Sequence, residues 1–86
     1  MSDIKLITKD DCPKCEWVKE QIAKNDYDVE ILNENTVLGM QFMAYYGLIQ
    51  EGQVFPVLIQ DDIEETTVGS ININRVLKGH FTSKSI

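Results

Sequence analysis

Apolar residues recur with two different periods in the first third of the chain. Residues 3–8 alternate and then run apolar, which predicts a strand that becomes buried within a sheet. Cys15, Val18 and Ile22 follow at i, i+3 and i+7, the spacing of one helix face. Residues 28–32 alternate again and predict a second strand. The chain therefore opens with strand, helix and strand, and a right-handed crossover would bring the two strands side by side.

This first helix has signals at both of its ends. Asp10 and Asp11 are expected to cap its amino end, because Asp is a favoured N-cap residue. Pro13 suits the first turn, since proline lacks the N–H group that would have no helical partner there. We expect the helix to end near Asn25.

A second helix is predicted in the middle of the chain. Asn35 or Thr36 can cap its start, and Gly47 is suited to end it. Its apolar residues are Val37, Met40, Phe42, Met43 and Ala44, and two tyrosines follow them. Apolar residues at this density in a helix are usually buried, so we interpret them mainly as core and not as a ligand surface.

The last third of the chain predicts a hairpin and a helix. Residues 55–60 are an apolar strand that begins with a proline, and the turn at 61–62 leads into a weaker strand at 63–68. Ser70 can cap the final helix, and Gly79 is expected to end it. The apolar positions of this helix are Ile71, Ile73, Val76 and Leu77.

The predicted order of elements is β-α-β-α-β-β-α. A chain of 86 residues is long enough for one domain, so we treat residues 1–86 as a single unit. A mixed four-stranded sheet with three helices on its faces is the simplest way to bury these elements. The sequence therefore predicts the α/β class.

The charge balance excludes some classes of partner. A formal net charge of -6 repels phosphate backbones and anionic headgroups, so we expect neither nucleic acid nor membrane as a partner. Charged residues interrupt the first twenty positions, and no stretch approaches a membrane span. We therefore expect a cytoplasmic protein. The acidic run at residues 61–65 is interpreted as a solvated hairpin and not as a pair of catalytic carboxylates.

The candidate chemistry lies in the segment Cys12-Pro13-Lys14-Cys15. At the start of a helix, the sulfur of Cys12 would face unpaired N–H groups and the positive end of the helix dipole, so its thiol would ionise readily. Cys12 is therefore the candidate nucleophile, and Cys15, one turn further, is the candidate resolving thiol. Half of a zinc site is the alternative, but His80 is the single histidine that could join the two sulfurs. A CxxC pair between a strand and a helix favours redox chemistry.

Three motifs resemble the glutaredoxin family, whose members have the thioredoxin-like fold. Residues 8–15, Thr-Lys-Asp-Asp-Cys-Pro-Lys-Cys, are similar to its active-site loop. Residues 54–56, Val-Phe-Pro, are similar to its cis-proline segment, and residues 68–70, Val-Gly-Ser, to the turn before its last helix. The resemblance extends over nearly the whole chain. It implies a thiol-disulfide oxidoreductase with glutathione as co-substrate and no tightly bound cofactor, which we expect to be a monomer.

The resemblance also implies a glutathione site. Lys9 would receive one carboxylate of glutathione, and the backbone of Phe55, beside a cis Pro56, would pair with its cysteine. Gly69 and Ser70 would receive the γ-glutamyl carboxylate at the start of the last helix. Pro13 and Lys14, between the two cysteines, would complete this site.

The sequence departs from the family at two places. Lys14 replaces a common aromatic residue, and Ile71-Asn72 replaces an acidic pair. A related branch, the small redoxins that are recharged by thioredoxin reductase and reduce ribonucleotide reductase, has a similar active-site loop. Four functions thus stay open: a glutathione-linked reductase of disulfide-containing proteins, such a redoxin, a metal or iron-sulfur carrier, or a purely structural or adaptor role.

Overall fold

The fold is organised around two central strands. The computed structural model describes residues 3–82. Within this range one four-stranded sheet has the order β2-β1-β3-β4. Strand β1 (Ile4–Thr8) pairs in parallel with β2 (Glu30–Asn33) and antiparallel with β3 (Val57–Gln60), and β3 pairs antiparallel with β4 (Glu65–Val68). The two central strands are the most buried, as their apolar sequences predict.

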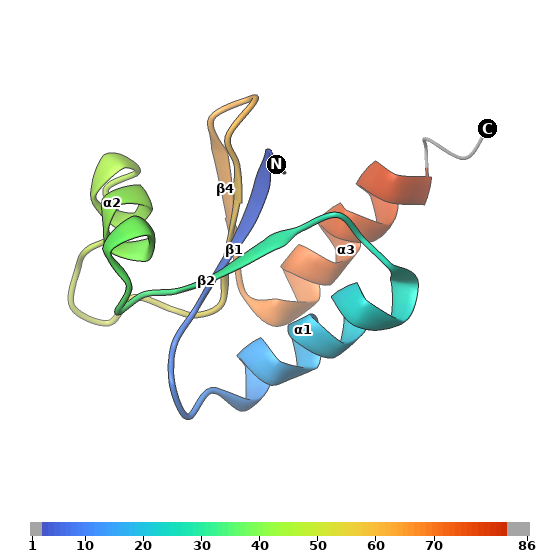
Figure 1. The fold of residues 1–86 in the computed structure, drawn as a ribbon, viewed down its shortest axis with the longest axis horizontal. Coiled ribbons are helices and arrows are strands. Elements are labelled where there is room, and N and C mark those ends of the chain that lie inside the picture. The colour runs from blue at the N-terminus through green and yellow to red at the C-terminus, as the bar shows by residue number, and fades with distance from the viewer. Residues whose placement is uncertain (1–2, 83–86) are drawn as a thin grey trace.

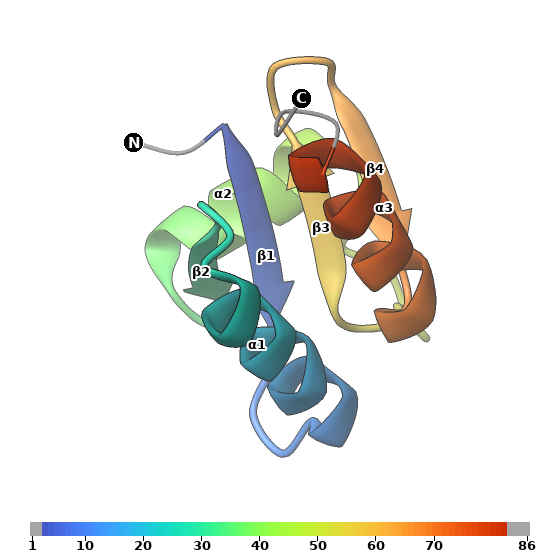
Figure 2. The same ribbon diagram turned by 90° about the vertical axis from the view of Figure 1, so that its right-hand side faces the viewer.

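Three helices cover the two faces of this sheet in the described part of the chain. Helices α1 (Pro13–Asn25) and α3 (Ser70–Thr82) lie side by side on one face, and α2 (Val37–Tyr45) lies on the other (Figure 1, Figure 2). The observed order of elements confirms the predicted β-α-β-α-β-β-α order and the α/β class. Among residues 3–82, no helix combines the length and the apolar character that crossing a membrane requires.

Each face of the sheet has its own hydrophobic core. One cluster fills the space between the sheet, α1 and α3, and its buried members are Ile4, Leu6, Val18, Ile22, Leu58, Ile73 and Leu77. The other lies toward α2, and its buried members are Ile7, Cys12, Cys15, Met43, Leu48, Phe55, Val57 and Ile59. The stripe of Cys15, Val18 and Ile22 is buried as its spacing predicts. Both cysteines therefore belong to the core on the α2 side.

Helix α2 is much more exposed than expected. Met43 is 5% exposed, but Val37 is 75%, Met40 53% and Tyr45 70% exposed. The prediction of a mainly buried helix is therefore wrong. Because α2 is the one helix described on this face, only the stripe that includes Gly39 and Met43 reaches the sheet, and nothing in the described chain covers the other side.

Several element boundaries differ from the predictions. Strand β2 begins at Glu30, after a turn in which Asp26 adopts a left-handed conformation with φ 54°. Strand β4 begins at Glu65 because the turn covers positions 61–64, where Glu64 has φ 53°. The pairing register of the hairpin sets the length of this turn, because Gln60 lies opposite Glu65.

Helix α3 also differs at both ends. Its first helical residue is Ser70, because the Ile73 N–H donates to the carbonyl of Gly69 at 3.0 Å, so Ser70 does not occupy the expected cap position. The helix also continues beyond Gly79 to Thr82. Phe81, in this last turn, stacks on Tyr27 with ring centroids 4.7 Å apart. This tertiary contact extends the helix past the residue that was expected to end it.

The acidic hairpin is tied to the end of α2 and is not merely solvated. The Tyr46 hydroxyl donates to the Asp61 carboxylate at 2.5 Å, and the Tyr45 hydroxyl donates to Glu64 at 3.2 Å. The hydrogen bond to Asp61 raises the pKa of Tyr46 from 10.0 to about 12. The charge of Glu64 likewise raises the pKa of Tyr45. Both tyrosine hydroxyls therefore hold their protons more tightly than a free tyrosine does, and each remains a hydrogen-bond donor to the hairpin.

Gly39 provides a test of how α2 is seated on the sheet. A Cβ atom at this position would overlap the backbone carbonyl oxygen of Asn33, at the end of β2. We expect Gly39→Ala to lower the free energy of unfolding by about 1–3 kcal/mol, measured by urea denaturation.

Gly79 in α3 is the matched control, because a Cβ atom there meets no atom within 4 Å. Gly79→Ala should raise the free energy of unfolding by about 0.5–1 kcal/mol through helix propensity. Equal effects of the two substitutions would contradict the close approach of α2 to Asn33.

Candidate active site

The candidate site lies at one edge of the sheet, where three connections meet. Strand pairing places Thr8 opposite Asn33 and Ile7 opposite Val57, and Val57 opposite Val68. The loop after β1, the segment before β3 and the turn after β4 therefore leave the sheet at the same edge. These are the three motifs that the sequence singled out, and the strand register brings them together.

Cys12 is the N-cap of α1. Its sulfur accepts a hydrogen bond from the Cys15 N–H at 3.1 Å, and its carbonyl accepts one from the Glu16 N–H at 3.1 Å. The prediction that Asp10 or Asp11 caps this helix is wrong, because both precede the cap position. Pro13 is the first helical residue, as expected.

The two aspartates shape the loop that leads to the cap. The side chain of Asp10 accepts a hydrogen bond from the Asn33 amide at 3.1 Å, which links this loop to the end of β2. Asp11 adopts a left-handed conformation with φ 53°, a region that Asp tolerates better than most residues. The loop thus turns the chain from β1 into α1 and places the Cys12 sulfur at the mouth of the helix.

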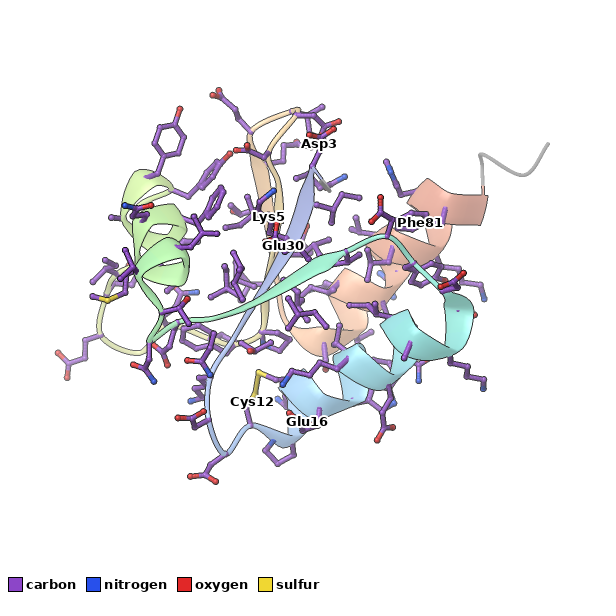
Figure 3. The ribbon with its side chains drawn as sticks, in the orientation of Figure 1. Asp3, Lys5, Cys12, Glu16, Glu30 and Phe81 are labelled. Atoms are coloured by element: carbon purple, nitrogen blue, oxygen red, sulfur yellow. A yellow bond between two sulfur atoms is a disulfide. The ribbon has the colours of Figure 1, made fainter. Side chains whose placement is uncertain are left out.

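Cys12 and Cys15 form a disulfide, with their Cα atoms 5.2 Å apart (Figure 3). The two residues differ in exposure: Cys12 is 7% exposed, whereas Cys15 is fully buried at 0%. Cys12 also lines a surface hollow with Asp11, Pro13 and Glu16. A thiolate that approaches from solvent therefore reaches the sulfur of Cys12 first.

The segment before β3 lies beside the disulfide. The Phe55–Pro56 peptide bond is cis, as the resemblance implies, and Phe55 belongs to the same hydrophobic cluster as both cysteines. The ammonium group of Lys9 lies 5.6 Å from the centre of the Phe55 ring. Lys9 is thus held near the disulfide by a contact between a cation and an aromatic ring.

The turn before α3 joins the same edge. The Gly69 N–H donates to the Pro56 carbonyl at 3.2 Å, and Gly69 has φ 94°, a conformation that L side chains rarely adopt. Ser70 follows at the first turn of α3 and is half-buried. Lys14 is exposed on the first turn of α1.

A cleft of about 350 Å³ opens beside Lys9 and Phe55. Its other lining residues come from the start and middle of α2, from the connection that precedes α2 and from the loop at positions 48–53: Glu34, Asn35, Met40, Met43, Leu48, Ile49, Gln50, Gly52 and Gln53. None of these residues was expected at the site from the sequence. The polar run at positions 33–36, directly after a strand, was the available signal, because it leaves the sheet at the edge where the cysteine loop begins.

Glu34 is placed in this cleft by the backbone. Its N–H donates to the Thr8 carbonyl at 2.7 Å, which continues the pairing of β1 and β2 by one residue. Lys9 follows Thr8, so the cleft holds one positive and one negative side chain on adjacent strand ends. The carboxylate reduces the attraction of the cleft for an anionic ligand.

The arrangement suits thiol-disulfide exchange. It combines a cysteine that lines a surface hollow at a helix amino end, a fully buried partner cysteine one turn further and a neighbouring cleft for a ligand. Among residues 3–82, no group of three or more His, Cys, Asp or Glu side chains is arranged to hold a metal ion. A metal carrier of the kind considered from the sequence would draw further ligands from a second chain or from glutathione.

A comparison of the chain with protein-family models, with curated proteins and with solved structures finds no match.

The unequal burial of the two sulfurs predicts the order in which they react. In the reduced protein, iodoacetamide should modify Cys12 well before Cys15, because the Cys15 sulfur has no solvent contact. Peptide mapping by mass spectrometry after short exposure measures this order. Cys12→Ser is the control, and rapid alkylation of Cys15 in the wild-type protein would contradict the predicted order.

Proposed function

We propose that this protein is a dithiol thiol-disulfide oxidoreductase of glutaredoxin type with a thioredoxin-like fold. The observation that carries the proposal is the Cys12–Cys15 disulfide at the amino end of α1, where Cys12 is the more exposed residue and its sulfur accepts a hydrogen bond from the Cys15 N–H. The placement of α1 and α3 on one face of the sheet and α2 on the other supports the thioredoxin-like assignment. The two central strands, with their parallel and antiparallel partners, agree with it.

The reaction begins with the reduced protein. The Cys12 thiolate attacks one sulfur of a substrate disulfide, which forms a mixed disulfide and releases the first substrate thiol. The Cys15 thiol then loses its proton and attacks the Cys12 sulfur, which releases the second substrate thiol and forms the Cys12–Cys15 disulfide. Two electrons thereby pass from the protein to the substrate. Two molecules of glutathione, or a flavoprotein reductase, return two electrons and restore the dithiol.

The amino end of α1 favours the first step. In the thiolate form, the Cys15 N–H would donate to a charged sulfur, and hydrogen bonds to charged acceptors are stronger than those to neutral ones. The helix dipole acts in the same direction. Asp11 and Glu16 line the hollow around Cys12 and oppose it. We place the reaction in the cytoplasm, where a cysteine pair can cycle between its two states.

The glutathione site of this proposal uses two residues of the cleft. Lys9 would bind a carboxylate of glutathione, and the backbone of Phe55 would pair with its cysteine beside the disulfide. Gly69 and Ser70, which the Gly69–Pro56 hydrogen bond brings next to this segment, would receive the other carboxylate. Pro13 would contact the ligand from the hollow that it shares with Cys12.

A second candidate is a redoxin that is recharged by thioredoxin reductase. The position of Glu34 in the same cleft as Lys9 favours it, because glutathione carries a net negative charge that this carboxylate repels. Ribonucleotide reductase is a natural electron acceptor for either candidate. The two candidates differ in the source of electrons.

Reduction of hydroxyethyl disulfide tests the proposal and separates its two forms. The assay is supplied first with glutathione and glutathione reductase, and then with thioredoxin reductase. Turnover with glutathione is expected for the first form, and turnover with the second system alone for the redoxin. Cys12→Ser should abolish turnover with both systems, whereas Cys15→Ser should retain it where a glutathione mixed disulfide is the substrate. If neither system supported turnover, the proposal would be overturned.

The two charges of the cleft should act in opposite directions on glutathione. Lys9→Gln should raise the KM for glutathione by about tenfold or less, because an exposed charge-assisted contact is lost. Glu34→Gln should lower this KM, since it removes a repulsive carboxylate. Steady-state kinetics measures both effects, and Lys24→Gln, at an exposed position outside this cleft, is the charge control. Equal changes for all three variants would contradict a glutathione site in the cleft.

A further inference from the structure

A second hollow lies on α2, away from the disulfide. It has a volume of about 470 Å³ and lies between α2 and the turn of the β3–β4 hairpin. Its lining residues are Leu38, Gln41, Phe42, Tyr45, Asp61 and Glu64. The hairpin turn follows Gln60, which pairs with Ile4 at the amino end of β1, whereas Cys12 follows the carboxyl end of that strand (Figure 1, Figure 3). The proposed redox reaction therefore does not use this hollow.

The hollow combines negative charge with aromatic rings. The hydroxyl of Tyr45 donates to Oε1 of Glu64, and that of Tyr46 donates to Oδ1 of Asp61. Among the described residues, no other hydrogen bond or ion pair engages these two carboxylates, so each keeps one oxygen for a ligand. The hydrogen bond to Asp61 is also the main cause of the raised pKa of Tyr46.

One ring of the hollow already binds a cation. The ammonium group of Lys5 lies 5.3 Å from the centre of the Phe42 ring, and it also pairs with Glu30 at 3.7 Å. The side chain of Lys5 is only 12% exposed, so this cation belongs to the folded structure. The Phe42 ring of α2 thus binds a cation that comes from the sheet. Tyr45 is 70% exposed, so its ring is open to a cation from solvent.

The segments of the sequence that form the hollow contain no lysine or arginine. None of the eight Lys and Arg residues lies between positions 25 and 74, whereas nine of the fourteen Asp and Glu residues do. This range includes α2, β3 and the whole hairpin. Apart from Lys5, which reaches in from β1, the described residues that line the hollow are neutral or acidic. A positively charged partner would be attracted here and a negatively charged one repelled.

The apolar surface beside the hollow indicates a protein partner. Val37 and Met40, on the same helix, are 75% and 53% exposed, and Leu38 at the wall of the hollow is 42% exposed. Exposed apolar residues that continue past a charged pocket are typical of protein interfaces, whereas a small cation would leave them uncovered.

We propose that the hollow between α2 and the β3–β4 turn binds an arginine side chain of a partner protein. A guanidinium group is planar, so it can stack on the Tyr45 ring while its N–H groups donate to Asp61 and Glu64. An ammonium group of lysine can make one of these contacts well, but its compact charge does not stack in this way. The neighbouring apolar side chains of α2 cover the rest of the partner segment.

A capped tetra-arginine peptide is the probe for this site. It is titrated into the isotope-labelled wild-type protein, and amide chemical shifts are followed by NMR. Shift changes are expected at Leu38, Phe42 and Tyr45. The matching peptide with citrulline in place of arginine keeps the shape without the charge and should leave the spectrum unchanged. Because this comparison uses wild-type protein alone, it does not depend on the folding of any variant.

Two double variants locate the binding. Asp61→Asn with Glu64→Gln should abolish the shift changes, since both carboxylates of the hollow are lost. Asp62→Asn with Glu65→Gln removes the same total charge from residues of the same hairpin that do not line the hollow, and it should retain them. Equal loss in both variants would overturn the proposal in favour of attraction by net charge.

Tetra-lysine and spermidine complete the test. Weaker binding of both than of tetra-arginine supports a guanidinium site. Equal or tighter binding of either, or shift changes centred away from α2, would overturn the proposal. Hydroxyethyl disulfide reduction by the variants with Asp61→Asn and Glu64→Gln should equal that of the wild-type protein, because the hollow is separate from Cys12. The binding test and the redox assay can therefore fail independently.

Discussion

The pairing of β1 with both of its neighbours is the constraint on which the candidate site depends. β1 is parallel to β2 and antiparallel to β3, so its carboxyl end meets the end of β2 and the beginning of β3. The cysteine loop, the Phe55–Pro56 segment and the Gly69 turn are far apart in sequence and lie next to one another for this reason. The hydrogen bond from Gly69 to Pro56 and the one from Asn33 to Asp10 join these connections across the edge.

At this edge, the start of α1 gives the two cysteines different environments. Pro13 supplies no N–H group, and the Cys15 N–H turns back to the Cys12 sulfur. The same helical turn that brings the sulfurs together buries Cys15 completely, whereas Cys12 keeps 7% of its surface exposed and lines a hollow. Local helix geometry and core packing thus give the two cysteines of one motif unequal access to solvent.

Helix α2 connects the two surfaces of interest. One side of it lines the cleft beside Lys9, and another lines the hollow beside the hairpin turn. Its close seating on the sheet depends on Gly39, where the backbone of Asn33 leaves no room for a Cβ atom. A helix that contacts its own domain through a narrow stripe has side chains free for contacts with other molecules.

Much of the fold could be read from local patterns. The alternation in β1, the stripe of Cys15, Val18 and Ile22, and the apolar run of β3 each follow from the period of a strand or helix. The cysteine pair of the candidate site was found from its local spacing. The segments at 54–56 and 68–70 were singled out by their resemblance to the glutaredoxin family, since each consists of residues that are adjacent along the chain.

Contacts between distant residues decided the rest. Cys12, and not Asp10 or Asp11, is the N-cap of α1. Helix α3 continues past Gly79, where Phe81 stacks on Tyr27. The register of the hairpin makes its turn longer than predicted. Glu34 joined the cleft through its backbone bond to Thr8, and two tyrosines met two carboxylates of the hairpin. The sequence pattern shows which residues are apolar, but it does not show how many helices cover each face of the sheet. For that reason the exposure of α2, and with it the second hollow, emerged only when the chain was folded.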